Sequence, residues 1–112
     1  MTLVEAYAGE IRLFAGDFAP RGWALCDGQR LSIDRFPVLF AIFGTTYGGD
    51  GIHNFALPDL RGRMPVHPAH NECVPGRVCT GAAVATGTDA QLTSTLSLNY
   101  IICLQGVYPD RS

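Results

Sequence analysis

Apolar and polar side chains alternate over residues 9–15. Ile11 and Leu13 fall on one face of this segment, and the charged residues Glu10 and Arg12 fall on the other. A period of two is the spacing of a half-buried strand, in which successive side chains point to opposite faces of a sheet. The pattern therefore predicts a β-strand here.

A second short strand is predicted over residues 23–26, where Trp-Ala-Leu-Cys follows a turn that contains proline and glycine. The pair Asp27-Gly28 then marks another turn, because both residue types favour the backbone angles that turns need. The two N-terminal strands can form a hairpin-like unit or lie apart in a small sheet, and the pattern leaves both arrangements open.

The chain is strongly apolar again over residues 96–104. Tyr100, Ile102 and Leu104 would share one face of a strand, and the positions between them are apolar as well. A strand that is apolar on both faces is buried centrally or covered by another subunit. We therefore expect a terminal apolar strand in one of these two situations.

One helix is predicted, over about residues 34–43. Asp34 is placed to accept hydrogen bonds from the free N–H groups of the first turn, where the missing donor of Pro37 does no harm. Gly44 is placed as the residue that ends the helix. The segment carries no charge after Arg35, so we expect it to be covered on several sides.

Between these elements the pattern predicts irregular structure. The glycine-rich residues 45–51 lack the lysine and the spacing of a phosphate-binding loop, and they are interpreted as turns with positive φ. Residues 55–66 read as an irregular extended run, because two prolines argue against a central strand. Residues 68–95 are rich in small and polar side chains and form a variable loop region.

The predicted fold is α+β, mostly β with irregular loops, one short helix and a C-terminal apolar strand. A length of 112 residues fits a single domain over residues 1–112. Residues 1–8 form a possible arm that would add an edge strand to a neighbouring copy.

The composition narrows the class of protein. Hydrophobic residues make up 47% of the chain and charged residues only 16%, against roughly 25% in an average protein. This scarcity of charge suggests that a partner covers part of the surface. The net charge is −2, and all eight basic residues are scattered arginines, so we expect no nucleic-acid partner. The longest apolar run is far shorter than a membrane span, and no conventional signal peptide is visible.

The four cysteines suggest structural rather than catalytic roles. Cys26 and Cys103 lie in apolar contexts and read as buried small hydrophobes, although a bridge between them would tie the front of the chain to its end. Cys73 and Cys79 are close enough in sequence to form a local disulfide, with two free thiols as the alternative.

A metal site is a weaker alternative for the same loop. His67, His70, Cys73 and Cys79 offer two imidazoles and two thiols, a ligand set that zinc accepts. Their spacing matches no standard zinc finger, and a disulfide would consume both thiols. We therefore favour loop residues with a local bridge, and expect no metal and no cofactor.

No set of residues predicts catalysis, so we expect no enzyme. Asp59, Arg61 and Arg63 are interpreted as an ion-pair turn in which the carboxylate holds the guanidinium groups and fixes the path of the loop. The aromatic side chains of Trp23, Tyr47 and Tyr100 have the chemistry to stack on a sugar face, although core or interface packing is their commoner use. This leaves a glycan-binding alternative through Trp23, Tyr47 and the Asp59/Arg61 turn.

Several segments taken together resemble the phage tail collar family, which includes bacterial proteins called microcystin-dependent proteins. The resemblance lies in residues 9–16, 20–29, 43–51, 57–63 and 98–106, of which Trp-Ala-Leu-Cys-Asp-Gly and Leu-Pro-Asp-Leu-Arg-Gly-Arg are the specific parts. It implies a collar domain of trimeric tail fibres without enzymatic activity. Relatives have a longer section after the Arg-Gly-Arg loop, so this chain resembles a shortened form.

The expected function is structural. We expect copies of the chain to assemble into a homo-oligomeric extracellular filament or a phage-tail-like fibre or collar, and the protein to be extracellular or virion-associated. A glycan-binding adhesin or receptor-binding fibre module, with cell-surface glycan as partner, is the alternative. The residues expected to serve assembly or structure are Trp23, Asp59, Arg61, Arg63, Tyr100, Ile102 and Leu104.

Overall fold

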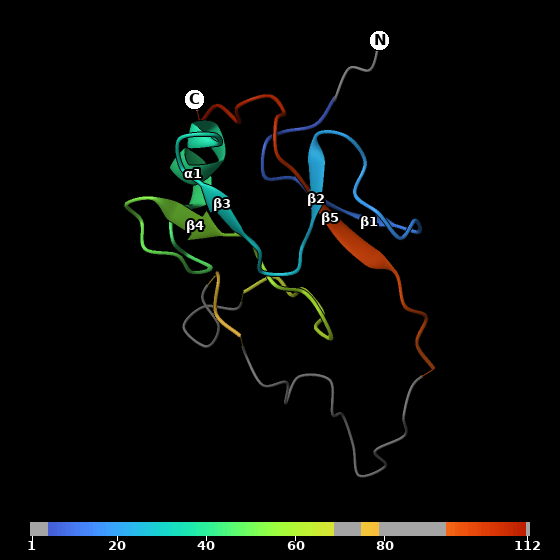
Figure 1. Cartoon of the computed structure of the whole chain (residues 1–112). Helices are drawn as coiled ribbons and strands as arrows, with labels where there is room; N and C mark the ends of the chain where they lie inside the picture. The colour runs from blue at the N-terminus through green and yellow to red at the C-terminus, as the bar shows by residue number, and fades with distance from the viewer. Residues whose placement is uncertain (1–4, 69–74, 79–93, 112) are drawn as a thin grey trace.

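The computed structural model describes residues 5–68, 75–78 and 94–111. Within these residues the chain forms, in order, β1 (Ile11–Phe14), β2 (Trp23–Leu25), β3 (Arg30–Ser32), α1 (Pro37–Phe43), β4 (Asn54–Ala56) and β5 (Asn99–Cys103). The strands make two small antiparallel sheets, and α1 lies beside β3 and β4 (Figure 1). The predicted fold class, mostly β with one short helix, is confirmed.

The larger sheet has the strand order β1-β5-β2. Ile102 of β5 lies opposite Ile11 on one side and opposite Ala24 on the other. The terminal strand is therefore central, as expected for a segment that is apolar on both faces, and its last three residues are at most 4% exposed. Of the two arrangements left open for β1 and β2, the structure has the one in which they lie apart.

The smaller sheet pairs β3 with β4, with Leu31 opposite Phe55. The sequence pattern did not predict this sheet, and the expectation of an irregular run from residue 55 was wrong at its start. Each strand has only three residues, which is too short for a period of two to be recognised. The prolines that argued against a strand follow β4, starting at Pro58, so they limit its length without preventing its formation.

Helix α1 begins three residues later than predicted. Its N-cap is Phe36, no side chain caps it, and the expected role of Asp34 as the cap is wrong. The N–H of Phe36 instead donates to the carbonyl oxygen of Ser32 at 3.1 Å, and Pro37 has no N–H that needs an acceptor. At the other end Gly44, with φ of 54°, donates to Phe40, which confirms Gly44 as the residue that ends the helix.

A single hydrophobic core joins both sheets and the helix. Phe55 of β4 lies at its centre and is fully buried, with Phe40 and Phe43 of α1 packed against its ring at centroid distances of 5.5 and 5.7 Å. The larger sheet contributes Ala24 and Ile102 to the same cluster. The other buried members of this core are Ala8, Cys26, Leu39 and Leu57.

The glycine-rich loop between α1 and β4 folds tightly against β4. Gly49 has φ of +100°, and a Cβ added to it would lie 2.8 Å from the carbonyl oxygen of Asn54, so only glycine fits here. The loop is closed by Asp50, whose Oδ1 accepts hydrogen bonds from the N–H groups of Ile52, His53 and Asn54. The interpretation of residues 45–51 as positive-φ turns is confirmed.

The N-terminal segment is tied to its own chain over residues 6–8. The N–H of Ala8 donates to the carbonyl oxygen of Val107 at 2.9 Å, and the N–H of Val107 donates to Ala6 at 2.8 Å. Ala6 and Ala8 are both buried. This part of the proposed arm is therefore not free to pair with a neighbour, and residues 1–4 lie outside the described residues.

Cys26 and Cys103 are free and buried, as expected for small hydrophobes, and the alternative of a bridge between them is wrong. The strand register explains why. Cys26 follows β2 on the face that also carries Ile102, while Cys103 lies opposite Trp23 and points to the other face. Burial raises the pKa of the Cys26 thiol to about 11 and also raises that of Cys103. The proposed bridge between Cys73 and Cys79 lies outside the described residues.

The central position of Phe55 predicts a large loss of stability for Phe55→Ala, by about 3–5 kcal/mol, because the cavity left among α1 and both sheets cannot fill. Chemical denaturation followed by circular dichroism measures this change. Phe18→Ala is the matched control, since Phe18 is 61% exposed, and we expect a much smaller effect there. Equal losses in the two variants would contradict the assignment of the core.

The raised pKa values of Cys26 and Cys103 predict unreactive thiols in the folded protein, because the thiolate is the nucleophile. In the double variant Cys73→Ser/Cys79→Ser, a thiol reagent at pH 8 should label almost nothing until denaturant is added, and should then label both remaining cysteines. Rapid labelling of the native double variant would show that these two side chains are not buried.

Candidate functional site

The Asp59 turn follows directly after β4 and is anchored to the end of β2. The backbones of Asp59 and Asp27 form an isolated antiparallel β-bridge. On either side of it, the N–H of Gly28 donates to the carbonyl oxygen of Pro58 at 3.2 Å, and the N–H of Leu60 donates to the carbonyl oxygen of Cys26 at 2.9 Å. The turn thus connects the smaller sheet to the larger one. Residues 55–58, which precede the turn, are buried, so the hydrophobic core sets the position of the turn.

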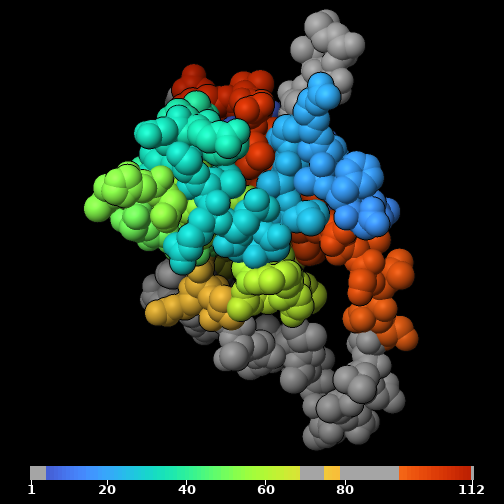
Figure 2. Space-filling view, viewed as in Figure 1, coloured from blue at the N-terminus to red at the C-terminus, as the bar shows by residue number. Residues whose placement is uncertain are grey.

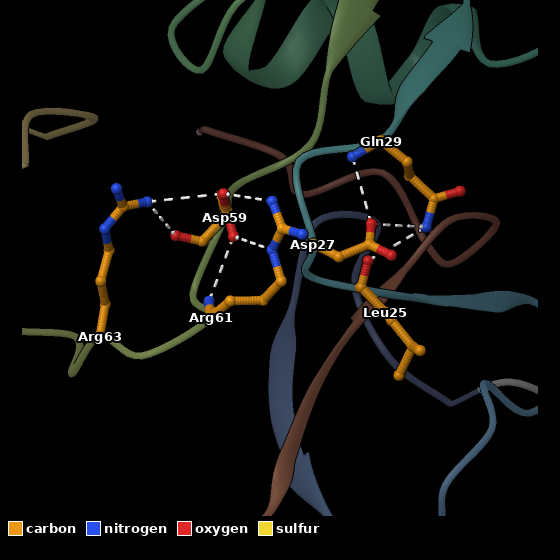
Figure 3. A network of polar contacts seen from close by, with 6 residues as sticks. All are labelled: Leu25, Asp27, Gln29, Asp59, Arg61 and Arg63. Atoms are coloured by element: carbon orange, nitrogen blue, oxygen red, sulfur yellow. Dashed lines mark hydrogen bonds and ion pairs between the residues drawn. The ribbon is translucent and has the colours of Figure 1, made fainter.

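Within the turn, Asp59 and Arg61 form a bidentate ion pair. The Nε of Arg61 donates to Oδ1 of Asp59 at 2.8 Å, and Nη2 donates to Oδ2 at 2.9 Å (Figure 3). Arg63 approaches from the other side, with its Nη1 2.8 Å from the carbonyl oxygen of Asp59 and 3.7 Å from Oδ2. The structure therefore brings together the three residues that the sequence pattern grouped.

This pairing fixes the charge state of the turn. The hydrogen bonds from the side chain and backbone of Arg61, together with the charges of Arg61 and Arg63, hold the pKa of Asp59 well below its usual range. The same contact raises the pKa of Arg61. A carboxylate with so low a pKa and with both oxygens engaged is a poor proton acceptor, so the turn has the properties of a structural clamp rather than of a general base.

A second polar cluster lies beside it at the end of β2. Oδ1 of Asp27 accepts hydrogen bonds from the backbone N–H and the side-chain amide of Gln29 at 3.2 and 3.1 Å. The same amide also donates to the carbonyl oxygen of Leu25 at 3.2 Å (Figure 3). These contacts all remain within residues 25–29, so they hold the chain where it leaves the strand.

The three aromatic side chains considered for sugar stacking contact different parts of the fold. The guanidinium of Arg12 lies over the ring of Trp23, 5.2 Å from its centroid. Tyr47 packs edge-on against Phe43 at 5.2 Å, and Tyr100 packs against the core. The register places Trp23 and Tyr100 on opposite faces of the larger sheet. They do not form a shared platform.

The apolar residues singled out on β5 and directly after it pack against the core. Ile102 is 1% exposed, and Tyr100 and Leu104, which are half-buried, pack against the same core cluster. These contacts contribute to the stability of the single chain. Of the metal candidates, His67 is exposed, while His70, Cys73 and Cys79 lie outside the described residues. The part of the chain that is described holds no group of three or more potential metal ligands.

Exposed apolar side chains form the feature that the sequence analysis did not single out. Ile11 and Leu13 of β1 are 39% and 57% exposed, and Leu96 and Leu98, which lead into β5, are exposed as well. Figure 2 shows the blue β1 region and the orange segment before β5 along one side of the molecule. The alternation in β1 marked one apolar face correctly, but it could not show that this face is only partly covered.

The fold and the site together define a small structural module, in which the polar groups of the Asp59 turn are paired with each other and several apolar side chains remain exposed. None of the helices in the described residues is long and apolar enough to span a membrane. Comparison with known families matches residues 9–65, just over half of the chain, to the Phage Tail Collar Domain. The chain belongs to this family, whose members are typically non-enzymatic and serve as structural parts of phage tails and fibres, which indicates association with a virion. Comparison with curated proteins gives no match.

The lowered pKa of Asp59 predicts a loss of stability in acid. A carboxyl group whose pKa is depressed by folding contributes stability above its unfolded pKa, near pH 4, and this contribution is lost as the pH falls through the lower folded value. Asp59→Asn should therefore melt at a lower temperature than the wild type at pH 7, and the difference should shrink as the pH falls below about 4.

Thermal melts between pH 7 and pH 2, followed by circular dichroism, measure this difference. Asp34→Asn is the matched control, because Asp34 is an exposed carboxylate away from the turn, and its effect should be small at every pH. A pH-independent gap between Asp59→Asn and the wild type would contradict a role for the ionised carboxylate.

Proposed function

We propose that this collar domain is a non-enzymatic subunit that assembles with copies of itself into an extracellular filament or a phage-tail-like fibre or collar. The observation that carries the proposal is the exposed apolar surface on and beside β1. A soluble monomer gains nothing from leaving Leu13 and Leu96 in water, and a concentration of exposed apolar side chains on neighbouring segments favours a contact site.

The polar residues support a structural role in the same way. The charged groups of the Asp59 turn are used in contacts within the chain, and so is the carboxylate of Asp50. Burial raises the pKa of the Cys26 and Cys103 thiols, which makes them poorer nucleophiles. The glycan-binding alternative has less support, because Trp23 and Tyr47 already contact Arg12 and Phe43.

Self-assembly predicts that the purified wild-type chain sediments as species larger than one chain, in proportions that rise with protein concentration. Analytical ultracentrifugation over a hundredfold concentration range measures this, and negative-stain microscopy distinguishes rings from fibres. A monodisperse monomer at the highest concentration would overturn the proposal. Specific, saturable binding on a glycan array, lost in Tyr47→Ala, would favour the adhesin instead.

A further inference from the structure

The larger sheet has two outer edges, and they differ in how far their backbone groups are used. On β2 two of the four outward-facing groups have local partners. The N–H of Trp23 donates to the carbonyl oxygen of Pro20 at 2.9 Å. The carbonyl oxygen of Leu25 accepts from the N–H of Asp27 at 3.0 Å and from the side chain of Gln29 at 3.2 Å. This edge is therefore partly occupied by contacts of its own chain.

The outer edge of β1 is open. Cys103 of β5 donates to the carbonyl oxygen of Glu10 at 2.9 Å, which fixes the direction of the backbone groups along β1. Since these groups alternate in an antiparallel ladder, the N–H and C=O of Ile11 and Leu13 point away from β5. Among the described residues, neither of these N–H groups donates to a backbone acceptor outside the ladder. An open edge of this kind is a template for another strand.

We propose that two copies of the chain join through β1, antiparallel and edge to edge, with Ile11 opposite Ile11 of the second copy. The inference rests on the proposed self-assembly and names one of its contacts. The open N–H and C=O of Ile11 would pair with those of Ile11 in the second copy, and the exposed side chains of Ile11 and Leu13 would lie on the same face of the joined sheet.

The charges on β1 select this register. With Ile11 at the centre, Glu10 lies opposite Arg12 of the second copy and Arg12 opposite its Glu10, which places two pairs of opposite charges across the contact. A centre at Arg12 would oppose two arginines, and like charges directly opposite are destabilising. A centre at Leu13 would leave Glu10 without a partner of opposite charge.

The charged side chains are accessible for this exchange. Glu10 and Arg12 already contact each other on one face of their own strand at 2.8 Å, with side chains 33% and 50% exposed. In the proposed pairing, Arg12 would exchange its present contacts with Glu10, the Trp23 ring and the carbonyl oxygen of Glu5 for Glu10 of the second copy. The contact is self-complementary and closes on itself, so a fibre needs a second surface. Tyr7, Val107 and Tyr108 are exposed near the chain ends and are available for one.

The register is tested by charge reversal and mixing. Glu10→Lys would place lysine opposite arginine at both ends of the contact, and Arg12→Glu would place glutamate opposite glutamate. We expect each variant alone to self-associate roughly tenfold more weakly than the wild type, because two attractive pairs become repulsive. A one-to-one mixture of the two should recover association, since every cross pair is then of opposite charge. Sedimentation velocity measures all three samples.

Asp34→Lys is the matched control, with the same change in charge on an exposed residue outside β1, and it should associate like the wild type. Leu13→Lys adds a test that leaves the Glu10–Arg12 contact intact, and it should also weaken association. Circular dichroism verifies that each variant is folded.

The outcomes separate this inference from the proposed function. A wild-type chain that stays monomeric overturns both. A wild-type chain that assembles, together with Glu10→Lys and Leu13→Lys variants that assemble equally well, overturns only the pairing through β1. Weakening by Glu10→Lys that the mixture does not relieve overturns the register centred on Ile11.

Discussion

The insertion of β5 between β1 and β2 is the interaction on which the rest of the fold depends. The two short N-terminal strands do not pair with each other, and they form no sheet until a segment from near the chain end supplies the strand between them. That strand also carries Ile102 into the core, where it meets residues of the helix and of the smaller sheet. The larger sheet and its share of the hydrophobic core follow from this single pairing.

The Asp59 turn shows how a polar cluster can also connect the parts of the fold. It lies where the smaller sheet joins the larger one, and its carboxylate is held by Arg61 through two parallel hydrogen bonds. Such a fork-to-fork geometry fixes direction as well as distance, which a flexible lysine would not do. All eight basic residues of the chain are arginines, which fits a protein whose basic side chains make fixed ion pairs.

Much of this could be predicted from the sequence, and the failures have physical causes. The strand at β1, the apolar strand at β5 and the end of the helix at Gly44 follow from local patterns of apolar, polar and glycine residues. Asp34 had the chemistry of a cap, but the Ser32–Phe36 hydrogen bond starts the helix in another way. The Asp59–Arg61 pair was predictable because its partners are two residues apart. The exposure of Leu13 was not, because it depends on which strand β1 meets and on which side.

The position of β5 has a consequence for how the protein is made. Synthesis proceeds from the N-terminus, so a growing chain that has emerged only as far as residue 68 contains both outer strands of the larger sheet and not the one between them. Ala24 and Leu39 then lack the side chain of Ile102 that completes their surroundings. The larger sheet cannot form before residues 99–103 emerge. During that interval its apolar side chains are accessible to chaperones or to another nascent chain on the same mRNA.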